Sequence, residues 1–570
     1  MPANAYPRRF VPPDMDPFDF PELVRLYREL LDRKVQTVEE MNRWLADFSE
    51  LFSFVDEYGN RRYIDKSCHT DDEAIQKKFM RFVEEVEPRS KPMAFALQKK
   101  YLESPVRKLM DRKRFEILDR KWQAEVDIFR DESVEIETQV TRKVTEYDQI
   151  NGRMMVNFRG QELTMQQIAR FLEDPDAQTR REAWEASARR RLVDREAIEG
   201  IYGALLPLRH KIAQNAGLSD FRAYQWKANK RFDYTPEDCL RFADAIAETC
   251  VPIVRRLDQQ RAKDLGVAMI RPWDSGVDVK GRSPLRPFDE KRVDDLVGKT
   301  REIFNRLSPA LASDFDQLKE HGNLDLESRK GKQPGGYLMP LEESRQPFIF
   351  MNAAGVHRDV ETLLHEGGHA FHHLASARED LVFLRSAPME FCEVASMSME
   401  LLGSAHLGVF YNEADTARAT RKMLEGIIYF FPWMAIIDSF QHWIYTHPGH
   451  QQPERQAKWM ELVNRFAGVV DWSGWENARE SLWQRQGHLF HAPFYYVEYG
   501  IAQLGALQLW MKARVDPNRA LANYRAALAL GGTRPLPELF AAAGIVFDLS
   551  QKTLRPLMEA IGEELERLPV

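Results

Sequence analysis

The chain has 570 residues, of which 44% are hydrophobic and 29% are charged, and its formal net charge is −7. These proportions predict a soluble globular protein, and the acidic balance argues against a global nucleic-acid-binding surface. Met1–Arg9 has no apolar core of a signal peptide, and we find no later stretch that is apolar for about 18 residues. We therefore expect a cytoplasmic protein with neither nucleic acid nor a membrane as partner.

The cysteines are few and far apart in the sequence. They are Cys68, Cys239, Cys250 and Cys392, and no two form a C-x-x-C pair. This spacing indicates neither a disulfide framework nor a thiolate zinc site. A metal, if the chain binds one, should be held by nitrogen and oxygen ligands.

Apolar residues recur at helical spacing along most of the chain. The pattern predicts helices over residues 21–33, 72–86, 97–128, 165–190 and 194–215, and again from about 388 almost to the end, with a break at Gly531-Gly532. Short strands are expected at Met154–Phe158 and Pro347–Met351, and loops at 266–290 and 330–337. The expected fold is mainly helical, with a small β-sheet next to the residues that perform the chemistry.

The stretch His365-Glu366-Gly367-Gly368-His369 matches the HExxH zinc-hydrolase motif. If residues 359–376 form a helix, with Asp359 as its N-cap, His365 and His369 lie one turn apart on one face and can bind one Zn²⁺. Glu366 can then take a proton from a water at the metal. Two adjacent glycines cost a helix about 1 kcal/mol each relative to alanine, so we expect something to approach the backbone closely there.

A third ligand is needed, because the motif alone arises by chance with a probability of roughly a few per cent in such a chain. Two other spacings of zinc peptidases do not fit, because they would place the third ligand at position 375 or at 388–389. These positions hold Ala375, Pro388 and Met389, which cannot bind zinc in this way. Glu393 lies 23 residues after His369, on a helix predicted to begin near Pro388, and an antiparallel return would bring it over the first helix. The alternative for Glu393 is a salt-bridged surface residue. Glu400, on the same face, is expected to support the site rather than to bind the metal.

These residues resemble a known family. His365 to His372, then Phe391-Cys392-Glu393-Val394-Ala395-Ser396-Met397, are similar to the thimet oligopeptidase and oligoendopeptidase F family of zinc metallopeptidases, and closer to the oligoendopeptidase branch. The similarity covers roughly residues 330–505. It implies a mainly α, neurolysin-like, two-lobed fold with a deep channel. We divide the chain into an N-terminal helical region, 1–195, and a catalytic region, 196–570.

The resemblance also implies roles for individual residues. One Zn²⁺ per chain would be bound by His365, His369 and Glu393, with Glu366 as general base. A segment rich in histidine and tyrosine would stabilise the oxyanion; its best matches are Tyr495, Tyr499 and either His491 or His488. The family's third tyrosine falls on Ala502, which leaves Tyr496 without a match, and an aromatic core cluster is the other interpretation of this segment. Phe348–Met351 could offer a strand edge to an extended peptide.

The function predicted from the sequence is a zinc-dependent endopeptidase acting on short, unstructured peptides. Two alternatives remain open. One is a carboxypeptidase or dipeptidyl carboxypeptidase on a similar helical fold, which would need a cationic group for the substrate's C-terminus. The other is a non-catalytic helical binding protein that keeps the motif as a structural metal site, although such sites usually have four protein ligands and only three candidates are evident here.

Overall fold

The structure, a computed structural model, describes residue 6 and residues 8–569, so residues 1–5 and 7 of the Met1–Arg9 segment lie outside it. The chain divides into two compact units, each built from separate stretches of sequence. The first comprises residues 1–126, 286–416 and 505–547, and the second comprises 127–285, 417–504 and 548–570. Neither unit ends at residue 195, so the division into 1–195 and 196–570 does not describe the compact units.

The first unit contains the N-terminal helices and the elements around the HExxH motif. Its N-terminal helices pack around a buried cluster that includes Trp44, Phe48 and Trp122. The elements are α1 (Phe20–Asp32), α2 (Val38–Cys68), α3 (Glu73–Arg81), α4 (Glu87–Glu103), α5 (Arg112–Ile128), α13 (Val293–Leu307), α14 (Pro309–Glu320), β3 (Leu324–Glu327), β4 (Tyr337–Leu341), β5 (Gln346–Ala353), α15 (His357–Ser376), α16 (Met389–Ser404), α22 (Pro517–Leu528) and α23 (Leu536–Ala542).

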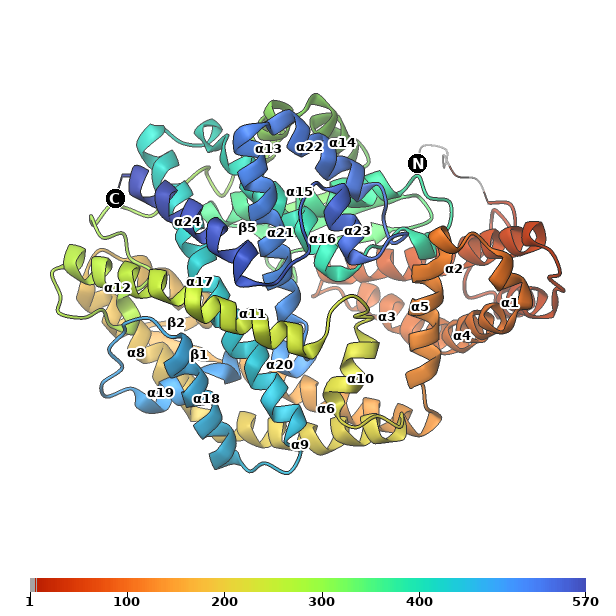
Figure 1. Ribbon diagram of the computed structural model, residues 1–570, viewed down its shortest axis with the longest axis horizontal. Helices are drawn as coiled ribbons and strands as arrows, with labels where there is room; N and C mark the ends of the chain where they lie inside the picture. The colour runs from red at the N-terminus through yellow and green to blue at the C-terminus, as the bar shows by residue number, and fades with distance from the viewer. Residues whose placement is uncertain (1–5, 7, 570) are drawn as a thin grey trace. The chain divides into compact units, whose positions relative to one another are not determined.

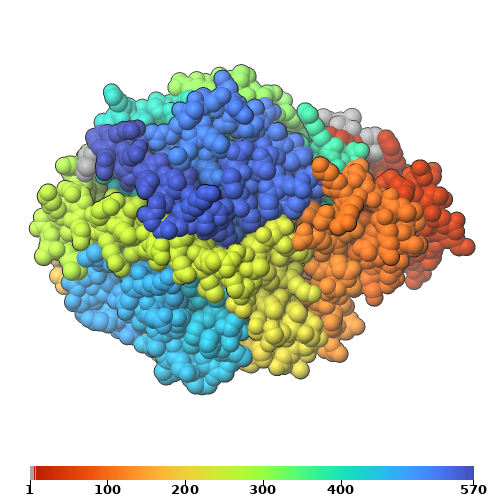
Figure 2. All heavy atoms as spheres, in the orientation of Figure 1, coloured from red at the N-terminus to blue at the C-terminus, as the bar shows by residue number. Residues whose placement is uncertain are grey.

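The second unit is helical apart from one hairpin. Its elements are α6 (Asp131–Gly152), β1 (Met155–Phe158), β2 (Gln161–Thr164), α7 (Met165–Ala169), α8 (Ala177–Val193), α9 (Arg195–Asn215), α10 (Phe221–Ala228), α11 (Pro236–Thr249), α12 (Val251–Leu265), α17 (Glu413–Thr446), α18 (Gln452–Phe466), α19 (Glu476–Glu480), α20 (His488–His491), α21 (Tyr496–Val515) and α24 (Gln551–Arg567). The unit boundaries at residues 126, 416 and 504 fall inside α5, α17 and α21. In Figure 2 the yellow-green surface that includes α12 lies beside the light-blue surface that includes α18. Ile270, which follows α12, forms an isolated β-bridge with Val470, which follows α18.

Proline explains why two predicted helices are each interrupted. The stretch 97–128 is divided between α4 and α5, because Ser104 is extended before Pro105 and a 3-10 turn follows. The stretch 165–190 is divided between α7 and α8, with a break around Pro175. The predictions for 21–33, 72–86 and 194–215 are confirmed to within about two residues, the second as α3 followed by a π-helical turn.

The three-stranded sheet has the order β3-β5-β4, so β5 is its central strand. Ile349 and Phe350 pair with β4 on one side and with β3 on the other. The prediction that Phe348–Met351 offers a free strand edge is therefore wrong, because both sides of this segment already have a strand neighbour. The edge strands are β3 and β4, and α2 packs against β4, where Asn60 donates a hydrogen bond to the Pro340 carbonyl at 3.0 Å.

One helix, α17, is long and apolar enough to cross a membrane by length and composition alone. The sequence pattern did not indicate a stretch of this kind. Its most apolar window is 67% buried inside the protein, as is typical of the core helix of a globular unit. We therefore interpret α17 as a core helix.

Candidate metal centre

Helices α15 and α16 pack side by side (Figure 1), and the two glycines of the motif permit close contacts of α15 with α16 and with α13. A Cβ atom on Gly368 would lie 2.6 Å from both the Ala395 carbonyl oxygen and Ser396 Cα. A Cβ atom on Gly367 would lie 2.6 Å from the ring of Phe304. The predicted close approach to the backbone is confirmed, and the neighbour is α16 on one side and the α13 ring of Phe304 on the other.

The start of α15 differs from the prediction. The helix begins at His357 with Val356 as N-cap, so Asp359 is not the N-cap but lies in the first turn. Its carboxylate nevertheless performs a capping function, because it accepts hydrogen bonds from the backbone N–H groups of Ala354 at 2.8 Å and Val356 at 2.9 Å. These bonds fix the turn between β5 and α15 and hence where the motif helix starts.

His365, His369 and Glu393 converge as a three-ligand set. Glu393 Oε2 lies 3.4 Å from His365 Nε2 and 3.7 Å from His369 Nε2, and the three candidate ligand atoms are all within 4.8 Å of one another. Glu393 is 6% exposed. Because two imidazoles and a carboxylate on rigid helices suit a borderline metal such as Zn²⁺, the donor set fits this ion.

Charged neighbours orient the first histidine. Glu400 Oε1 lies 2.6 Å from His365 Nδ1. Burial opposes a charged imidazole, yet hydrogen bonds with Glu393 and Glu400 raise the pKa of His365 to about 10. The two carboxylates therefore hold a proton on His365 in the metal-free protein, and a bound cation would replace that proton.

Glu366, the acid between the two histidines of the motif, has a buried carboxylate. It is 6% exposed, and among the residues that the structure describes its Oε2 has no hydrogen-bond partner. Burial raises the pKa of Glu366 to about 7, with Glu393 and Glu400 adding repulsion. A buried carboxylate without a partner is costly, so this residue has the properties of a proton acceptor kept available for a ligand.

A second buried cluster, in the other unit, does not have the same properties. Candidate ligand atoms of Cys239, Asp438 and His442 also lie within 4.8 Å of one another. However, His442 Nε2 lies 3.1 Å from Asp438, and Arg222 Nη1 lies 3.5 Å from Nδ1. A metal-bound imidazole keeps its proton on the other nitrogen and needs an acceptor there. Arginine can only donate, whereas Glu400 accepts, so of these two clusters the one on α15 and α16 is the better fit for a metal.

His372 and His373 follow the motif but do not join the ligand set. The ring of His372 packs edge-on against Phe391, and burial lowers the pKa of His372 to about 3. The pKa of His373 is also lowered by burial. Both rings are therefore neutral.

The predicted tyrosine segment belongs to the second unit, and there it forms one aromatic cluster. The ring of His488 lies 6.0 Å from Tyr495, 5.0 Å from Tyr496 and 5.8 Å from Tyr499, measured between centroids. Gln486 contacts His488 Nδ1 at 2.7 Å, and burial lowers the pKa of His488. Tyr496 also lies in the cluster, and burial raises its pKa to about 12.

His491 faces a different neighbour. Its Nε2 lies 3.0 Å from a carboxylate oxygen of Asp148 on α6, and its ring contacts Tyr147. Of the two histidines that the sequence left as alternatives, only His488 therefore contacts the tyrosines in the structure.

A strained residue precedes the tyrosines. Phe494 is fully buried and has φ = 64°, an unfavourable conformation for an aromatic residue. Its N–H donates to Gln441 at 2.6 Å, and its carbonyl accepts from Arg231, which also pairs with Glu498 at 2.9 Å. These contacts hold the turn that leads into α21 and so determine where Tyr495 and Tyr499 point.

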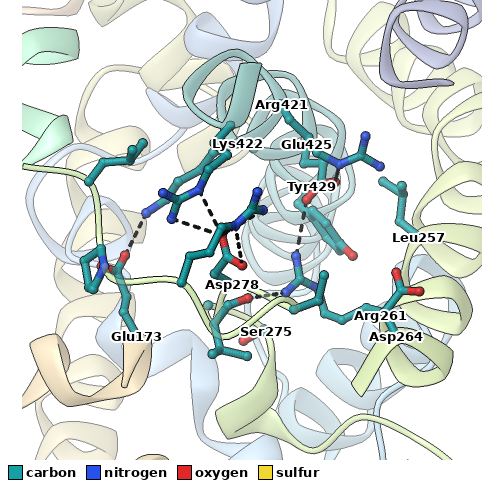
Figure 3. A pocket seen from close by; sticks show the side chains of 18 of the residues that line it. Glu173, Leu257, Arg261, Asp264, Ser275, Asp278, Arg421, Lys422, Glu425 and Tyr429 are labelled. Atoms are coloured by element: carbon teal, nitrogen blue, oxygen red, sulfur yellow. Dashed lines mark hydrogen bonds and ion pairs between the residues drawn. The ribbon is translucent and has the colours of Figure 1, made fainter. Parts of the chain in front are cut away.

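A pocket of about 320 Å³ lies in the second unit beside α17 (Figure 3). All but one of its charged side chains pair with one another: Glu425 with Arg261 and Arg421, Asp278 with Arg282 and Arg418, and Glu173 with Lys422. The exception, Asp264, accepts a hydrogen bond from Gln260. The pairs fix the loop of residues 272–285 against α17. Because these charges neutralise one another, we interpret the pocket as a structural anchor and assign it no ligand.

A mainly helical fold and a site of two histidines and one glutamate beside a buried glutamate together define a protein of the metallopeptidase class. A comparison of the sequence with models of known protein families identifies the family within this class. The model described as peptidase family M3 matches residues 170–559, and that of the peptidase M3 N-terminal domain matches residues 11–129. The chain belongs to peptidase family M3. The resemblance to oligoendopeptidases seen in the sequence is thereby confirmed.

Individual relatives agree with this assignment. An oligoendopeptidase F homolog of Mycoplasma pneumoniae is 24% identical over 250 residues, covering 41% of this chain and 40% of that protein. Oligopeptidase A of Haemophilus influenzae is 25% identical over 247 residues, covering 34% and 36%. The matched region thus spans less than half the length of either relative. A solved structure of PZ peptidase A with an inhibitor is 27% identical, with a TM-score of 0.88 and 98% of each chain covered.

Proposed function

We propose that this protein is a zinc-dependent endopeptidase that hydrolyses short, unstructured peptides. The observation that supports this most directly is the arrangement on α15 and α16, where three ligand atoms converge beside an unpartnered buried carboxylate. One Zn²⁺ per chain, a cytoplasmic location, and the absence of nucleic acid or membrane partners are part of the same proposal.

His365, His369 and Glu393 would hold the metal. When bound, Zn²⁺ supplies a Lewis acid that polarises the peptide carbonyl and makes a water nucleophilic. Glu366 accepts the proton that this water loses and then donates it to the leaving amine, with the pKa of its carboxyl raised by burial into the range that suits such a transfer.

Tyr495 and Tyr499 would donate hydrogen bonds to the oxyanion that develops on the carbonyl. Between the two candidate histidines, His488 is the better choice for a third donor because it contacts these tyrosines, whereas His491 pairs with Asp148. Tyr496 also belongs to this aromatic cluster, but we assign it no catalytic role.

Glu366→Gln tests the assignment. We expect bound zinc to stay at one equivalent per chain, because Glu366 is not a ligand, and kcat on an internally quenched peptide to fall by about 10²- to 10⁴-fold. The matched control is Glu361→Gln, on the same helix, whose carboxylate pairs with Arg358 at 3.3 Å and does not belong to the ligand set. Full activity in Glu366→Gln would reject the mechanism.

The alternatives give different products. A carboxypeptidase or dipeptidyl carboxypeptidase would fail on peptides with a blocked C-terminus, whereas the proposed endopeptidase should cleave them internally. Mass analysis of digests made with and without a chelator distinguishes these two enzymes from a non-catalytic binding protein, which would give no products in either case.

A further inference from the structure

Ser396 contacts the proposed metal ligand directly. It lies on α16, one turn after Glu393, and is fully buried. Its Oγ is 3.0 Å from Glu393 Oε2 and 3.0 Å from the Glu393 carbonyl oxygen. An ionised carboxylate accepts only and is a stronger acceptor than a peptide carbonyl, so the hydroxyl proton points to the carboxylate.

The oxygen that accepts from Ser396 is also the one that faces the histidines. Glu393 Oε2 is the atom 3.4 Å from His365 Nε2 and 3.7 Å from His369 Nε2. A glutamate side chain has several rotatable bonds, and fixing them when a metal binds costs conformational entropy. Because the hydrogen bond from Ser396 fixes these bonds before the metal binds, binding itself loses less entropy.

The position of Ser396 is itself fixed by packing. A Cβ atom added to Gly368 would lie 2.6 Å from Ser396 Cα, so the backbones of α15 and α16 are in close contact at this point. The preceding carbonyl, of Ala395, accepts a hydrogen bond of 2.8 Å from the hydroxyl of Tyr524, which is buried on α22. The backbone that carries the Ser396 side chain is thus held by neighbours on both sides.

We propose that Ser396 is a positioning residue that holds the Glu393 carboxylate in its metal-binding orientation and thereby increases the affinity of the site for zinc. This inference rests on the proposed function, since it assumes that Glu393 is a ligand. Ser396 does not contact the metal or the substrate in this role; it acts through Glu393.

The same helix offers a matched control. Ser398 is also fully buried, and its Oγ has no hydrogen-bond partner among the described residues. Ser396→Ala and Ser398→Ala therefore remove the same atom from the same helix, but only the first change removes a contact with Glu393.

The experiment is a zinc titration of the full-length protein against a competing chelator, at constant pH and ionic strength. We expect Ser396→Ala to weaken zinc binding by about 10- to 100-fold, and Ser398→Ala to leave it within about a factor of two of the natural protein. In the Co²⁺-substituted protein, the visible absorption bands should shift in Ser396→Ala only. Circular dichroism of the metal-free variants checks that both are folded.

Glu393→Ala separates failure of this inference from failure of the proposed metal centre. If the natural protein and Glu393→Ala bind zinc equally, Glu393 is not a ligand and the proposed function fails. If Glu393→Ala loses the metal while Ser396→Ala matches the natural protein in affinity and Co²⁺ spectrum, only the role of Ser396 is overturned. An equal loss in Ser396→Ala and Ser398→Ala would also overturn it, because the effect would then belong to helix packing.

Discussion

Glu400 shows how a side chain that does not bind the metal can prepare one that does. Its carboxylate accepts from Nδ1 of His365 at 2.6 Å, which leaves Nε2 of that ring free to face Glu393 and a metal. The sequence placed Glu400 on the correct helix face but could not identify its partner, because side-chain pairing between two helices depends on their packing.

Glu400→Ala should lower zinc affinity by about 10- to 100-fold, since His365 would lose the acceptor that fixes its tautomer. Glu400→Gln keeps an acceptor oxygen and should lose less. Competition with a chelator measures both, and an affinity in Glu400→Ala equal to that of the natural protein would remove Glu400 from the site.

Asp56, on α2, is a half-buried acid outside the metal centre. Burial, with repulsion from Glu342 and Glu57, raises the pKa of Asp56 to about 7. The folded protein therefore binds more protons than the unfolded chain between about pH 4 and pH 7, so this residue's contribution to stability falls as pH rises through that window. Above about pH 7 the carboxylate is ionised in both the folded and the unfolded state, and its burial lowers the free energy of unfolding by a constant amount.

Asp56→Asn should therefore stabilise the first unit at pH 8 by on the order of 1 kcal/mol, and by progressively less as the pH falls toward 4. Asn60, which donates to Asp56 at 2.9 Å, would keep its acceptor. Thermal denaturation at a series of pH values measures the difference. Asp65→Asn, on the same helix but 44% exposed in its side chain, should show no such trend; a stability gain in Asp56→Asn that does not depend on pH would contradict the assignment.

The pairing of α15 with α16 determines whether the site exists. Neither helix contains all three ligands, so their separation sets the distances among His365, His369 and Glu393. The glycine at 368 permits that separation because its neighbours across the interface are backbone atoms, which cannot move aside as a flexible side chain could.

Gly368→Ala should destabilise the protein by about 1–3 kcal/mol through overpacking and should reduce bound zinc. The control, Gly298→Ala, changes an exposed glycine of α13 with no atom near the added Cβ, and should instead stabilise by about 0.5–1 kcal/mol. Thermal denaturation and metal analysis of both variants test this; unchanged zinc content in Gly368→Ala would show that the interface tolerates expansion.

The two units contain different residues of the candidate site. The candidate ligands and Glu366 belong to the first unit, and the tyrosine cluster belongs to the second. Each unit is assembled from three separate stretches of the chain, so no contiguous segment contains either one. Family resemblance implies a channel that admits unfolded peptides, and this determines the substrate class that we propose.

Peptides of graded length, digested beside a folded protein and the same protein after unfolding, test the substrate class. We expect cleavage of the short peptides, little cleavage of the folded protein, and inhibition by a chelator in every case. Efficient cleavage of the folded protein would contradict a restricted channel.

The sequence alone predicted the helical character, the three candidate ligands on α15 and α16, and the family, because these depend on local periodicity and on residue types at fixed spacing. Periodicity did not reveal the breaks at Pro105 and Pro175, which interrupt helices without changing their apolar pattern. Only the tertiary structure decided that β5 is central, that His488 rather than His491 contacts the tyrosines, and that Ser396 bonds to Glu393. Strand neighbours and side-chain partners depend on how distant segments pack, and spacing along the chain contains no measure of that.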